Sequence, residues 1–184
     1  MPTVVVPFRG TEGKSRLAGL PLDDRAALRE AMLADVLAAC EPVASRILVA
    51  GQADQGEAVE AALRGIESGP TLVVNADLPC VQPRDLLTLL GALPDGGLAL
   101  VEAQDGTTNA LALAAPHLFA RLYGPGSAER FRARAERLGL PAATAEIPNL
   151  AEDVDTLADL ERLEGRLGPR TAVGLGELRA GLVR

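Results

Sequence analysis

The sequence predicts an α/β protein whose mainly parallel sheet is covered by helices on both faces. Short apolar runs rich in Val, Leu and Ala alternate along the chain with longer segments in which apolar residues recur at helical spacing. Hydrophobic residues make up 48% of the 184 residues and aromatic residues only 2%, so the core must be aliphatic. No repeat, linker or low-complexity segment divides the chain. We therefore expect one domain over residues 1–184.

The first half of the chain alternates strands with helices. Three apolar runs rich in β-branched residues are expected to be strands, at residues 3–8, 46–50 and 71–75. The helix after the first strand can be capped by Asp23 or Asp24 and should run through residue 39. Two further helices are expected at residues 57–65 and 83–90. Pro83 supports the last of them, because proline is favoured in the first turn of a helix.

The second half continues the pattern with weaker signals. Strands are expected at residues 98–103, 110–113 and 143–147. An arginine-rich, exposed helix is expected at residues 127–138 and an amphipathic helix at residues 156–167. Residues 168–184 have weak periodicity, so we expect a loosely packed extension there.

Charge and cysteine content exclude several functions. With 18 basic and 25 acidic residues the net charge is −7, which argues against nucleic acid as a partner. Cys40 and Cys80 have neither metal-ligand spacing nor a disulfide framework. No signal peptide precedes Val4, and no apolar run approaches the length of a membrane span. We expect a soluble, cytoplasmic protein that does not contact a membrane.

The loop after the first strand concentrates positive charge. It contains Arg9, Lys14 and Arg16, and Lys14 is the only lysine in the chain. Glycines let such a loop bend around a ligand, and three cations suit a phosphate chain; the alternative is an ordinary solvated loop. Gly13-Lys14-Ser15 resembles the end of a P-loop, but Phe8 stands where the first glycine should be. Glycine and proline also follow too soon for the required helix, so we reject a P-loop.

Acidic residues follow two predicted elements. Asp77 comes directly after the strand at 71–75, at the edge of the sheet where open α/β folds bind ligands. A carboxylate there suits Mg²⁺, although it could also cap the next helix. Asp153 and Asp155 lie two apart in an extended segment and would point the same way. They could share a cation, or Asp155 or Thr156 could cap the following helix, and both can hold together.

Two further motifs could bind an anion. Thr108 lies in a polar turn, residues 105–111, that leads into a strand. Gly124 and Ser127 lie where a glycine-rich turn enters a helix, and backbone amides there can bind an anion. Taken alone, the second motif fits an ordinary loop with Ser127 as helix cap.

The order of these motifs from residue 3 to 165 resembles the guanylyltransferases of coenzyme F420 biosynthesis, which join GTP to phosphoenolpyruvate or 2-phospho-L-lactate. The resemblance implies the three-layer α/β/α, Rossmann-like fold of nucleotide-diphospho-sugar transferases and a Mg²⁺-dependent nucleotidyltransferase. It implies catalytic roles for three residues, Lys14, Arg16 and Asp77. It assigns the nucleotide to Arg9, Lys14 and Arg16. It assigns metal binding to Asp77, Asp153 and Asp155. It assigns the phosphorylated acid to Thr108, Gly124 and Ser127.

The sequence thus predicts transfer of GMP from GTP to phosphoenolpyruvate, with Mg²⁺ as cofactor. Phosphoenolpyruvate is favoured over 2-phospho-L-lactate because the Ala-, Leu- and Arg-rich composition resembles that of bacterial members. One alternative is a related nucleotidyltransferase for a sugar phosphate or molybdopterin, although the glycine-rich L-x-G-G-x-S-x-R-M-G-type loop is missing. Another is a non-catalytic nucleotide-binding domain. A homodimer is compatible with the sequence, which does not determine the oligomeric state.

Overall fold

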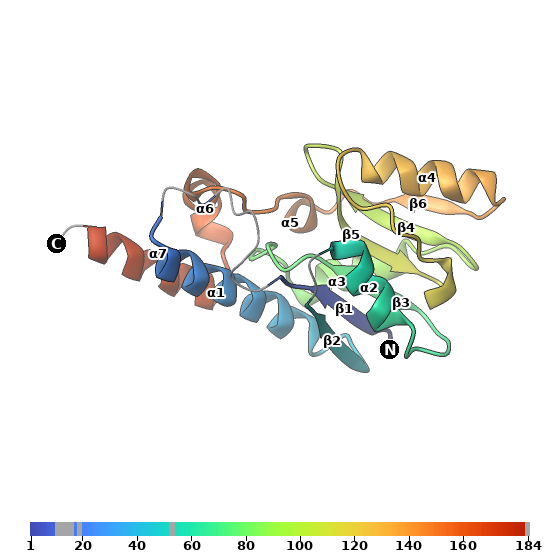
Figure 1. Cartoon of the computed structure of the whole chain (residues 1–184), viewed down its shortest axis with the longest axis horizontal. Coiled ribbons are helices and arrows are strands. Elements are labelled where there is room, and N and C mark those ends of the chain that lie inside the picture. Colours follow the sequence, from blue (N-terminus) through green and yellow to red (C-terminus); the bar gives the residue numbers. More distant parts are fainter. Residues whose placement is uncertain (10–16, 18–19, 52–53, 183–184) are drawn as a thin grey trace.

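The computed structural model describes residues 1–9, 17, 20–51 and 54–182. In this part of the chain six strands form one sheet, flanked by helices (Figure 1). The strands are β1 (Thr3–Pro7), β2 (Arg46–Ala50), β3 (Thr71–Val74), β4 (Leu98–Glu102), β5 (Thr108–Leu113) and β6 (Ala142–Thr144). The helices are α1 (Leu22–Cys40), α2 (Gln55–Leu63), α3 (Pro83–Gly91), α4 (Ser127–Arg137), α5 (Pro148–Ala151), α6 (Leu157–Leu163) and α7 (Pro169–Leu182). Two short 3₁₀ helices are η2 (Pro116–Leu118) and η3 (Glu164–Arg166).

The sheet is mainly parallel, as predicted. Its strand order is β2-β1-β3-β5-β4-β6. Val5 of β1 pairs in parallel register with Leu48 on one side and Val73 on the other. Among the described strands β5 alone runs antiparallel to its neighbours, β3 and β4. Because of that reversal, Thr108 at the start of β5 lies at the edge of the sheet where β1 and β3 end.

Helices cover both faces of the sheet, because alternate strand residues point to opposite sides. Val4 and Val6 belong to a buried cluster that includes apolar residues of α1, α3 and α5. Val5 belongs to the cluster on the other face, with residues of α2 and α4. In that second cluster Phe131 of α4 packs edge to face against Tyr123, with ring centroids 5.6 Å apart. The three-layer α/β/α architecture predicted from the sequence is confirmed.

The expected loose extension at residues 168–184 is wrong. Residues Pro169–Leu182 form α7, which lies along α1 (Figure 1). Leu175 and Leu178 of α7 are buried against α1 and α6 in a third apolar cluster. The weak periodicity reflects the glycines of this helix, which are poor helix formers, so tertiary packing must stabilise it.

A side chain from α1 caps the start of α7. The Asp35 carboxylate accepts hydrogen bonds from the backbone N–H groups of Arg170 (3.1 Å) and Thr171 (2.8 Å). The chain approaches so closely that a Cβ on Gly168 would lie 2.3 Å from Cγ of Asp35. A side chain at position 168 would collide with Asp35, so glycine permits this close approach. No sequence pattern near residue 168 indicates this, because the capping residue lies far away in the chain, on α1.

Helix starts differ from the prediction in detail. Asp23 and Asp24 lie inside the first turn of α1, whose N-cap is Pro21. Their carboxylates are favourable there because they face the positive end of the helix dipole. Helix α2 begins at Gln55, earlier than expected, because the Asp54 side chain accepts a hydrogen bond from the amide of Glu57. None of the described helices is both long and apolar enough to cross a membrane.

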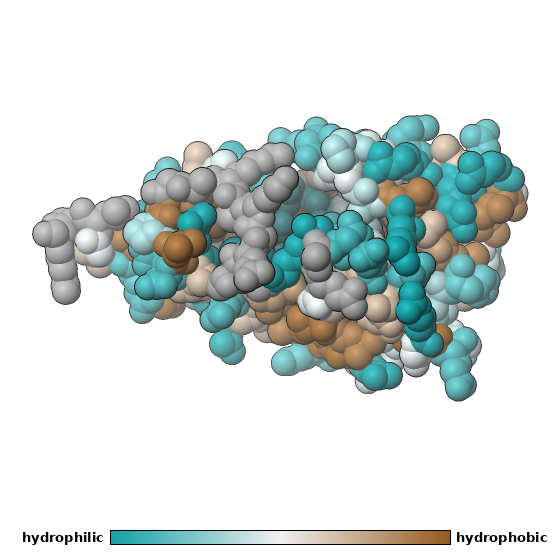
Figure 2. Space-filling model, viewed as in Figure 1, coloured by the Kyte–Doolittle hydropathy of each residue, from teal (hydrophilic) through white to brown (hydrophobic). Residues whose placement is uncertain are grey.

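The surface is mixed in polarity. On the face shown in Figure 2, hydrophilic side chains gather across the middle and hydrophobic ones at the lower edge, over β2 of Figure 1. Val49 of β2 is 49% exposed. The single histidine, His117, is exposed on η2, as the sequence indicated.

Candidate active site

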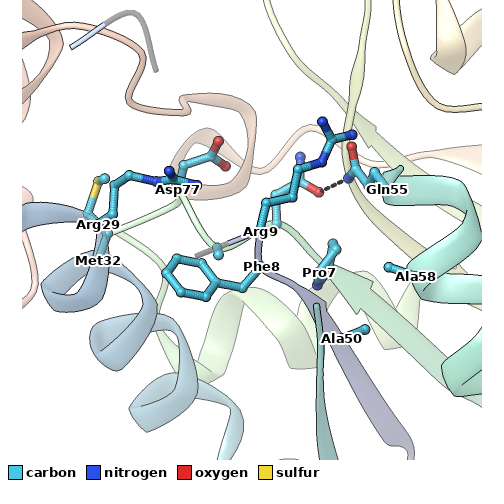
Figure 3. Close-up of a pocket in the computed structure, with 11 residues that line it drawn as sticks. Pro7, Phe8, Arg9, Arg29, Met32, Ala50, Gln55, Ala58 and Asp77 are labelled. Carbon is cyan, nitrogen blue, oxygen red and sulfur yellow. Dashed lines mark hydrogen bonds between the residues drawn. The ribbon is translucent and has the colours of Figure 1, made fainter. Parts of the chain in front are cut away.

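The candidate site is a cavity at the ends of β1 and β3. Its lining comes from four elements and the turn after β3: Pro7, Phe8, Arg9, Arg29, Met32, Ala50, Gln55, Ala58, Asn75, Ala76 and Asp77 (Figure 3). Asp77 therefore lies where the sequence placed it, beyond the carboxyl end of a buried strand. It does not cap the following helix, because the N-cap of α3 is Gln82.

The Asp77 carboxyl group is electrostatically unusual. Its Oδ1 atom is buried and has no hydrogen-bond partner among the described residues. The pKa of Asp77 is raised to about 7, first by burial and then by the negative charges of Asp153 and Asp155. A backbone hydrogen bond and the positive charge of Arg29 act in the opposite direction. An anionic oxygen left unpaired in such a place is costly unless something positive binds it.

The two other predicted metal ligands lie next to Asp77. The backbone N–H of Val154 donates to the Asp77 carbonyl oxygen at 2.9 Å, which ties the segment before α6 to the turn after β3. Val154 itself is buried in the third apolar cluster, so Asp153 and Asp155 on either side of it point the other way. Both aspartates line a neighbouring hollow that Figure 3 does not draw.

Thr156 is the cap of α6, so neither Asp153 nor Asp155 caps that helix. The Thr156 hydroxyl accepts from the Asp159 amide at 3.2 Å, and the Asp159 carboxylate accepts from the Thr156 amide at 2.9 Å. This reciprocal pair is a capping box. The sequence had left open whether Asp155 or Thr156 caps the helix, and the structure gives that role to Thr156.

The donor set fits Mg²⁺. Within the described ranges, no three His, Cys, Asp or Glu side chains are grouped closely enough to enclose a metal ion by themselves. Mg²⁺ rarely needs such a cage, because it binds through one or two carboxylates together with substrate phosphates and water. The unpaired Oδ1 of Asp77, beside the charge of Asp153, could serve as one such carboxylate ligand.

A chain of side-chain amides connects the cavity to Asp153. Gln55 Nε2 donates to Asn75 Oδ1 at 2.7 Å, and Asn75 Nδ2 lies 3.4 Å from Asn109 Oδ1. Asn109 Nδ2 in turn donates to Asp153 Oδ1 at 3.2 Å. Since the carboxylate can only accept, the orientation of every amide in the chain is fixed. These hydrogen bonds join α2, the turn after β3, β5 and the segment before α6.

The residues predicted to bind the phosphorylated acid also lie together. Ser127 Oγ donates to Thr108 Oγ1 at 3.1 Å, and the Ser127 amide donates to the Gly124 carbonyl at 3.0 Å. Both hydroxyls are buried in this structure. Gly126, with φ of 68°, is the N-cap of α4, and Ser127 is the first helical residue, so Ser127 is not the cap. Gly124 has φ of 109°, a conformation that favours glycine.

An arginine of α4 holds the turn that contains Gly124. The Arg130 guanidinium donates to the carbonyl oxygen of Leu122 at 2.7 Å and to that of Tyr123 at 3.1 Å. Another hydrogen bond reaches the carbonyl oxygen of Pro125. These hydrogen bonds tie the glycine turn to α4.

Two cationic residues line the cavity on its β1 side. Arg9 follows β1 and was predicted to bind the nucleotide. Figure 3 shows its side chain beside Gln55. Arg29, on α1, extends toward Asp77. Lys14 and Arg16 lie outside the described residues.

Sequence reasoning missed Arg29, Gln55 and Asn109. Asn109 stands inside the polar motif that the resemblance used, next to Thr108, and its position at the start of a strand was a usable signal. Arg29 and Gln55 gave none, because each is one of many polar residues on an amphipathic helix. Only the packing of α1 and α2 against the sheet brings them to the cavity.

The fold is that of the nucleotide-diphospho-sugar transferases. A structure from Desulfovibrio desulfuricans G20 assigned to that class superimposes with a TM-score of 0.72 and 17% identity, covering 98% of this chain and 96% of the other. A 2-C-methyl-D-erythritol 4-phosphate cytidylyltransferase from Thermus thermophilus gives a TM-score of 0.57 at 19% identity over 88% of this chain and 96% of the other. At these identities the likeness shows the fold alone.

Sequence relatives give the family. The phosphoenolpyruvate guanylyltransferase of Conexibacter woesei is 36% identical over 90% of this chain and 88% of that protein, and that of Rubrobacter xylanophilus is 33% identical over 89% and 94%. The 2-phospho-L-lactate guanylyltransferase of Natronomonas pharaonis is 34% identical over 85% of this chain and 82% of that protein. No protein-family model matches the chain. The chain belongs to the family of phosphoenolpyruvate and 2-phospho-L-lactate guanylyltransferases, which confirms the resemblance seen in the sequence.

Proposed function

We propose that this protein is a phosphoenolpyruvate guanylyltransferase that joins GTP and phosphoenolpyruvate to give enolpyruvyl-diphospho-guanosine and pyrophosphate in coenzyme F420 biosynthesis. The observation that carries the proposal is the position of Asp77. Its unpaired carboxyl oxygen lies beyond the end of β3, and in the sheet β3 stands between β1, which Arg9 follows, and β5, which begins at Thr108. The names of the relatives from Conexibacter woesei and Rubrobacter xylanophilus support the same substrates.

The reaction needs charge neutralisation and positioning more than acid–base catalysis. A phosphate monoester has a second pKa of about 6, so at neutral pH the acceptor is already a dianionic nucleophile. One of its oxygens bonds to the α-phosphorus of GTP, the bond from that phosphorus to the bridging oxygen breaks, and pyrophosphate leaves with the electron pair. No general base is required, which suits a protein whose single histidine, His117, is exposed on η2. Holding the two anions in line supplies much of the rate.

Different residues along the end of the sheet would supply charge neutralisation and positioning. Arg9 offsets phosphate charge on the β1 side. The family resemblance assigns the same task to Lys14 and Arg16. We propose that Mg²⁺ binds Asp77 together with Asp153, Asp155 or both. When bound, Mg²⁺ supplies positive charge that stabilises the developing negative charge on phosphate oxygens.

The acceptor would occupy the β5 side of the site, near Thr108, Gly124 and Ser127. Phosphoenolpyruvate and 2-phospho-L-lactate both carry a carboxylate beside a phosphate, and they differ in whether the central carbon is planar or tetrahedral. A pocket discriminates such a difference by only about 1–3 kcal/mol. We therefore expect a preference for phosphoenolpyruvate with measurable activity on 2-phospho-L-lactate. The relative from Natronomonas pharaonis makes 2-phospho-L-lactate the second candidate.

Pyrophosphate release tests the proposal directly. Each nucleoside triphosphate is combined with phosphoenolpyruvate, 2-phospho-L-lactate, other phosphorylated three-carbon acids and a sugar phosphate, with Mg²⁺ and with EDTA. Mg²⁺-dependent release with GTP, fastest with phosphoenolpyruvate and slower with 2-phospho-L-lactate, is the expected result. A clear preference for 2-phospho-L-lactate would change the proposed acceptor, and the proposed guanylyltransferase activity would stand. Release with a sugar phosphate alone, or with no pair, would contradict the proposal, and the second result would favour a non-catalytic nucleotide-binding domain.

Two further expectations from the sequence stay proposals. One is a cytoplasmic location. The other is a homodimer, which light scattering coupled to size-exclusion chromatography tests by comparing the measured mass with the 19.1 kDa of one chain.

A further inference from the structure

Arg29 is a cationic residue of the cavity to which the chemistry above gives no task. It lies on α1, outside every motif that the sequence singled out. Its side chain leaves α1 and reaches toward Asp77 (Figure 3). The centre of its guanidinium lies 5.5 Å from the centroid of the Phe8 ring, close enough for a cation–π contact. That contact and the helix backbone together set the direction of the side chain.

The guanidinium has an unsatisfied donor. Arg29 Nη1 is buried, and no hydrogen-bond partner is found for it in the described part of the chain. Buried donors in native structures almost always have partners, so this donor can donate to an oxygen atom of a ligand or of water. Asp77 Oδ1, in the same cavity, is an unsatisfied acceptor. Arg29 and Asp77 thus line one cavity without completing each other's hydrogen bonding, so each can still bind a ligand atom.

The charges around Arg29 favour an anion. Burial lowers its pKa, the negative charge of Asp77 raises it, and the positive charge of Arg9 lowers it. Arg9 and Arg29 therefore repel each other across the cavity. A phosphate group between them would remove that repulsion and give both guanidinium groups a strong acceptor, since arginine binds phosphate oxygens in a fork geometry.

The strand order indicates which phosphate this is. Along the edge of the sheet lie β1 with Arg9, then β3 with Asp77 beyond its end, then β5 with Thr108 at its start. In an in-line displacement the attacking and leaving oxygens lie on opposite sides of the reacting phosphorus. If the acceptor approaches from the β5 side, the leaving group must lie on the β1 side, where Arg29 is.

We propose that Arg29 binds the β- and γ-phosphates of GTP, the part that leaves as pyrophosphate. This inference rests on the proposed guanylyltransferase activity and adds a phosphate-binding residue that neither the motifs nor the relatives' names indicate. It also assigns a direction to the reaction: acceptor at β5 and α4, leaving group at β1 and α1.

Calorimetric titration with GTP, GDP and GMP, in EDTA and again with Mg²⁺, tests the inference without turnover. Arg29→Gln should weaken GTP binding roughly ten- to hundredfold, the usual effect of losing a charge-assisted hydrogen bond. GDP should lose less, and GMP affinity should stay within about twofold, because GMP lacks the phosphates that Arg29 would bind. Arg46→Gln is the matched control, because Arg46 is exposed at the start of β2, at the opposite edge of the sheet. It should bind all three nucleotides as the wild-type protein does.

A second measurement uses the unaltered protein, in case Arg29→Gln does not fold. Phenylglyoxal modifies accessible arginines, and mass spectrometry locates the modified residues. GTP and pyrophosphate should protect Arg29 and GMP should not, while Arg46 is modified equally throughout. Unchanged GTP affinity of Arg29→Gln, an equal loss for GMP, or no protection of Arg29 by pyrophosphate would overturn the inference. Failure of the guanylyltransferase proposal shows separately, as absence of pyrophosphate release by the wild-type protein.

Discussion

Asn109 donates a hydrogen bond from Nδ2 to Oδ1 of Asp153 over 3.2 Å, although 44 positions separate the two residues in the chain. Asn109 is 1% exposed at the start of β5, and Asp153 lies in the segment before α6. The bond holds one oxygen of a predicted metal ligand and ends the amide chain that begins at Gln55. It links the cavity around Asp77 to the segment before α6.

Asn109→Leu should lower kcat/KM for GTP roughly ten- to hundredfold. The substitution keeps the approximate size of the side chain and removes the donor to Asp153. It also removes one of the two acceptors of Asn75 Nδ2. A hydrogen bond to a charged group contributes about 1.5–3 kcal/mol. Steady-state pyrophosphate release gives the value.

Asn149→Leu is the matched control for this change. Asn149 donates to Asp85 Oδ2 at 3.0 Å, a similar amide-to-carboxylate bond at the cap of α3. Its kcat/KM should stay within about twofold of wild type, since the bond lies away from the cavity. Similar losses in both variants would mean that Asn109 supports the fold and not the site.

Asp77→Asn should abolish turnover, with a loss of about a hundredfold or more, because the amide keeps the shape of the carboxyl group and removes the charge. Initial rates across a Mg²⁺ titration measure the loss. Asp95→Asn, at an exposed turn before β4, should behave as wild type. Near-normal turnover of Asp77→Asn at saturating Mg²⁺ would mean that Asp77 has a structural role in the turn and none in catalysis.

The same substitution should stabilise the metal-free protein at alkaline pH. The pKa of Asp77 is about 7 in the folded protein and about 4 in an unfolded chain. Between these values the folded state keeps a proton that the unfolded state has lost, so the free energy of unfolding falls as pH rises from about 4 to about 7. Asparagine does not titrate and avoids that loss. In EDTA, Asp77→Asn should therefore melt above wild type at about pH 8, with a difference that shrinks toward about pH 5; a difference independent of pH would contradict the raised pKa.

Ser127→Ala should raise KM for phosphoenolpyruvate and leave KM for GTP nearly unchanged, because Ser127 lies on the acceptor side with Thr108. Kinetics with each substrate varied in turn separate the two constants, and urea unfolding of the same variant reports stability. Since the hydroxyl is buried, a purely structural role would show as lost stability with both KM values moving together.

Asp35→Ala should destabilise the protein by about 1–2 kcal/mol, because it removes the acceptor that caps α7 from α1. Turnover at room temperature should remain near wild type, since Asp35 lies outside the cavity around Asp77. Urea denaturation measures the change, and Asp23→Ala in the exposed first turn of α1 should cost less than about 0.5 kcal/mol. An unchanged midpoint for Asp35→Ala would mean that α7 docks through its apolar side chains alone.

Local patterns were sufficient for most of the fold. Apolar runs such as residues 46–50 and capping signals such as Pro83 depend on neighbouring residues, so they could be read along the chain. The same holds for Asp77, which follows a buried strand and therefore lies at the edge of the sheet. The family resemblance rested on the order of such local motifs, and the relatives confirm it.

Tertiary packing alone decided the rest. The antiparallel β5 brings Asn109 to Asp153, and the docking of α1 brings Arg29 to the cavity. Helix α7 forms although its own sequence is a weak helix former, because Asp35 and the apolar surface of α1 stabilise it. The physical reason is common to all three. Each depends on a contact between segments far apart in the chain, and no pattern within either segment specifies its partner.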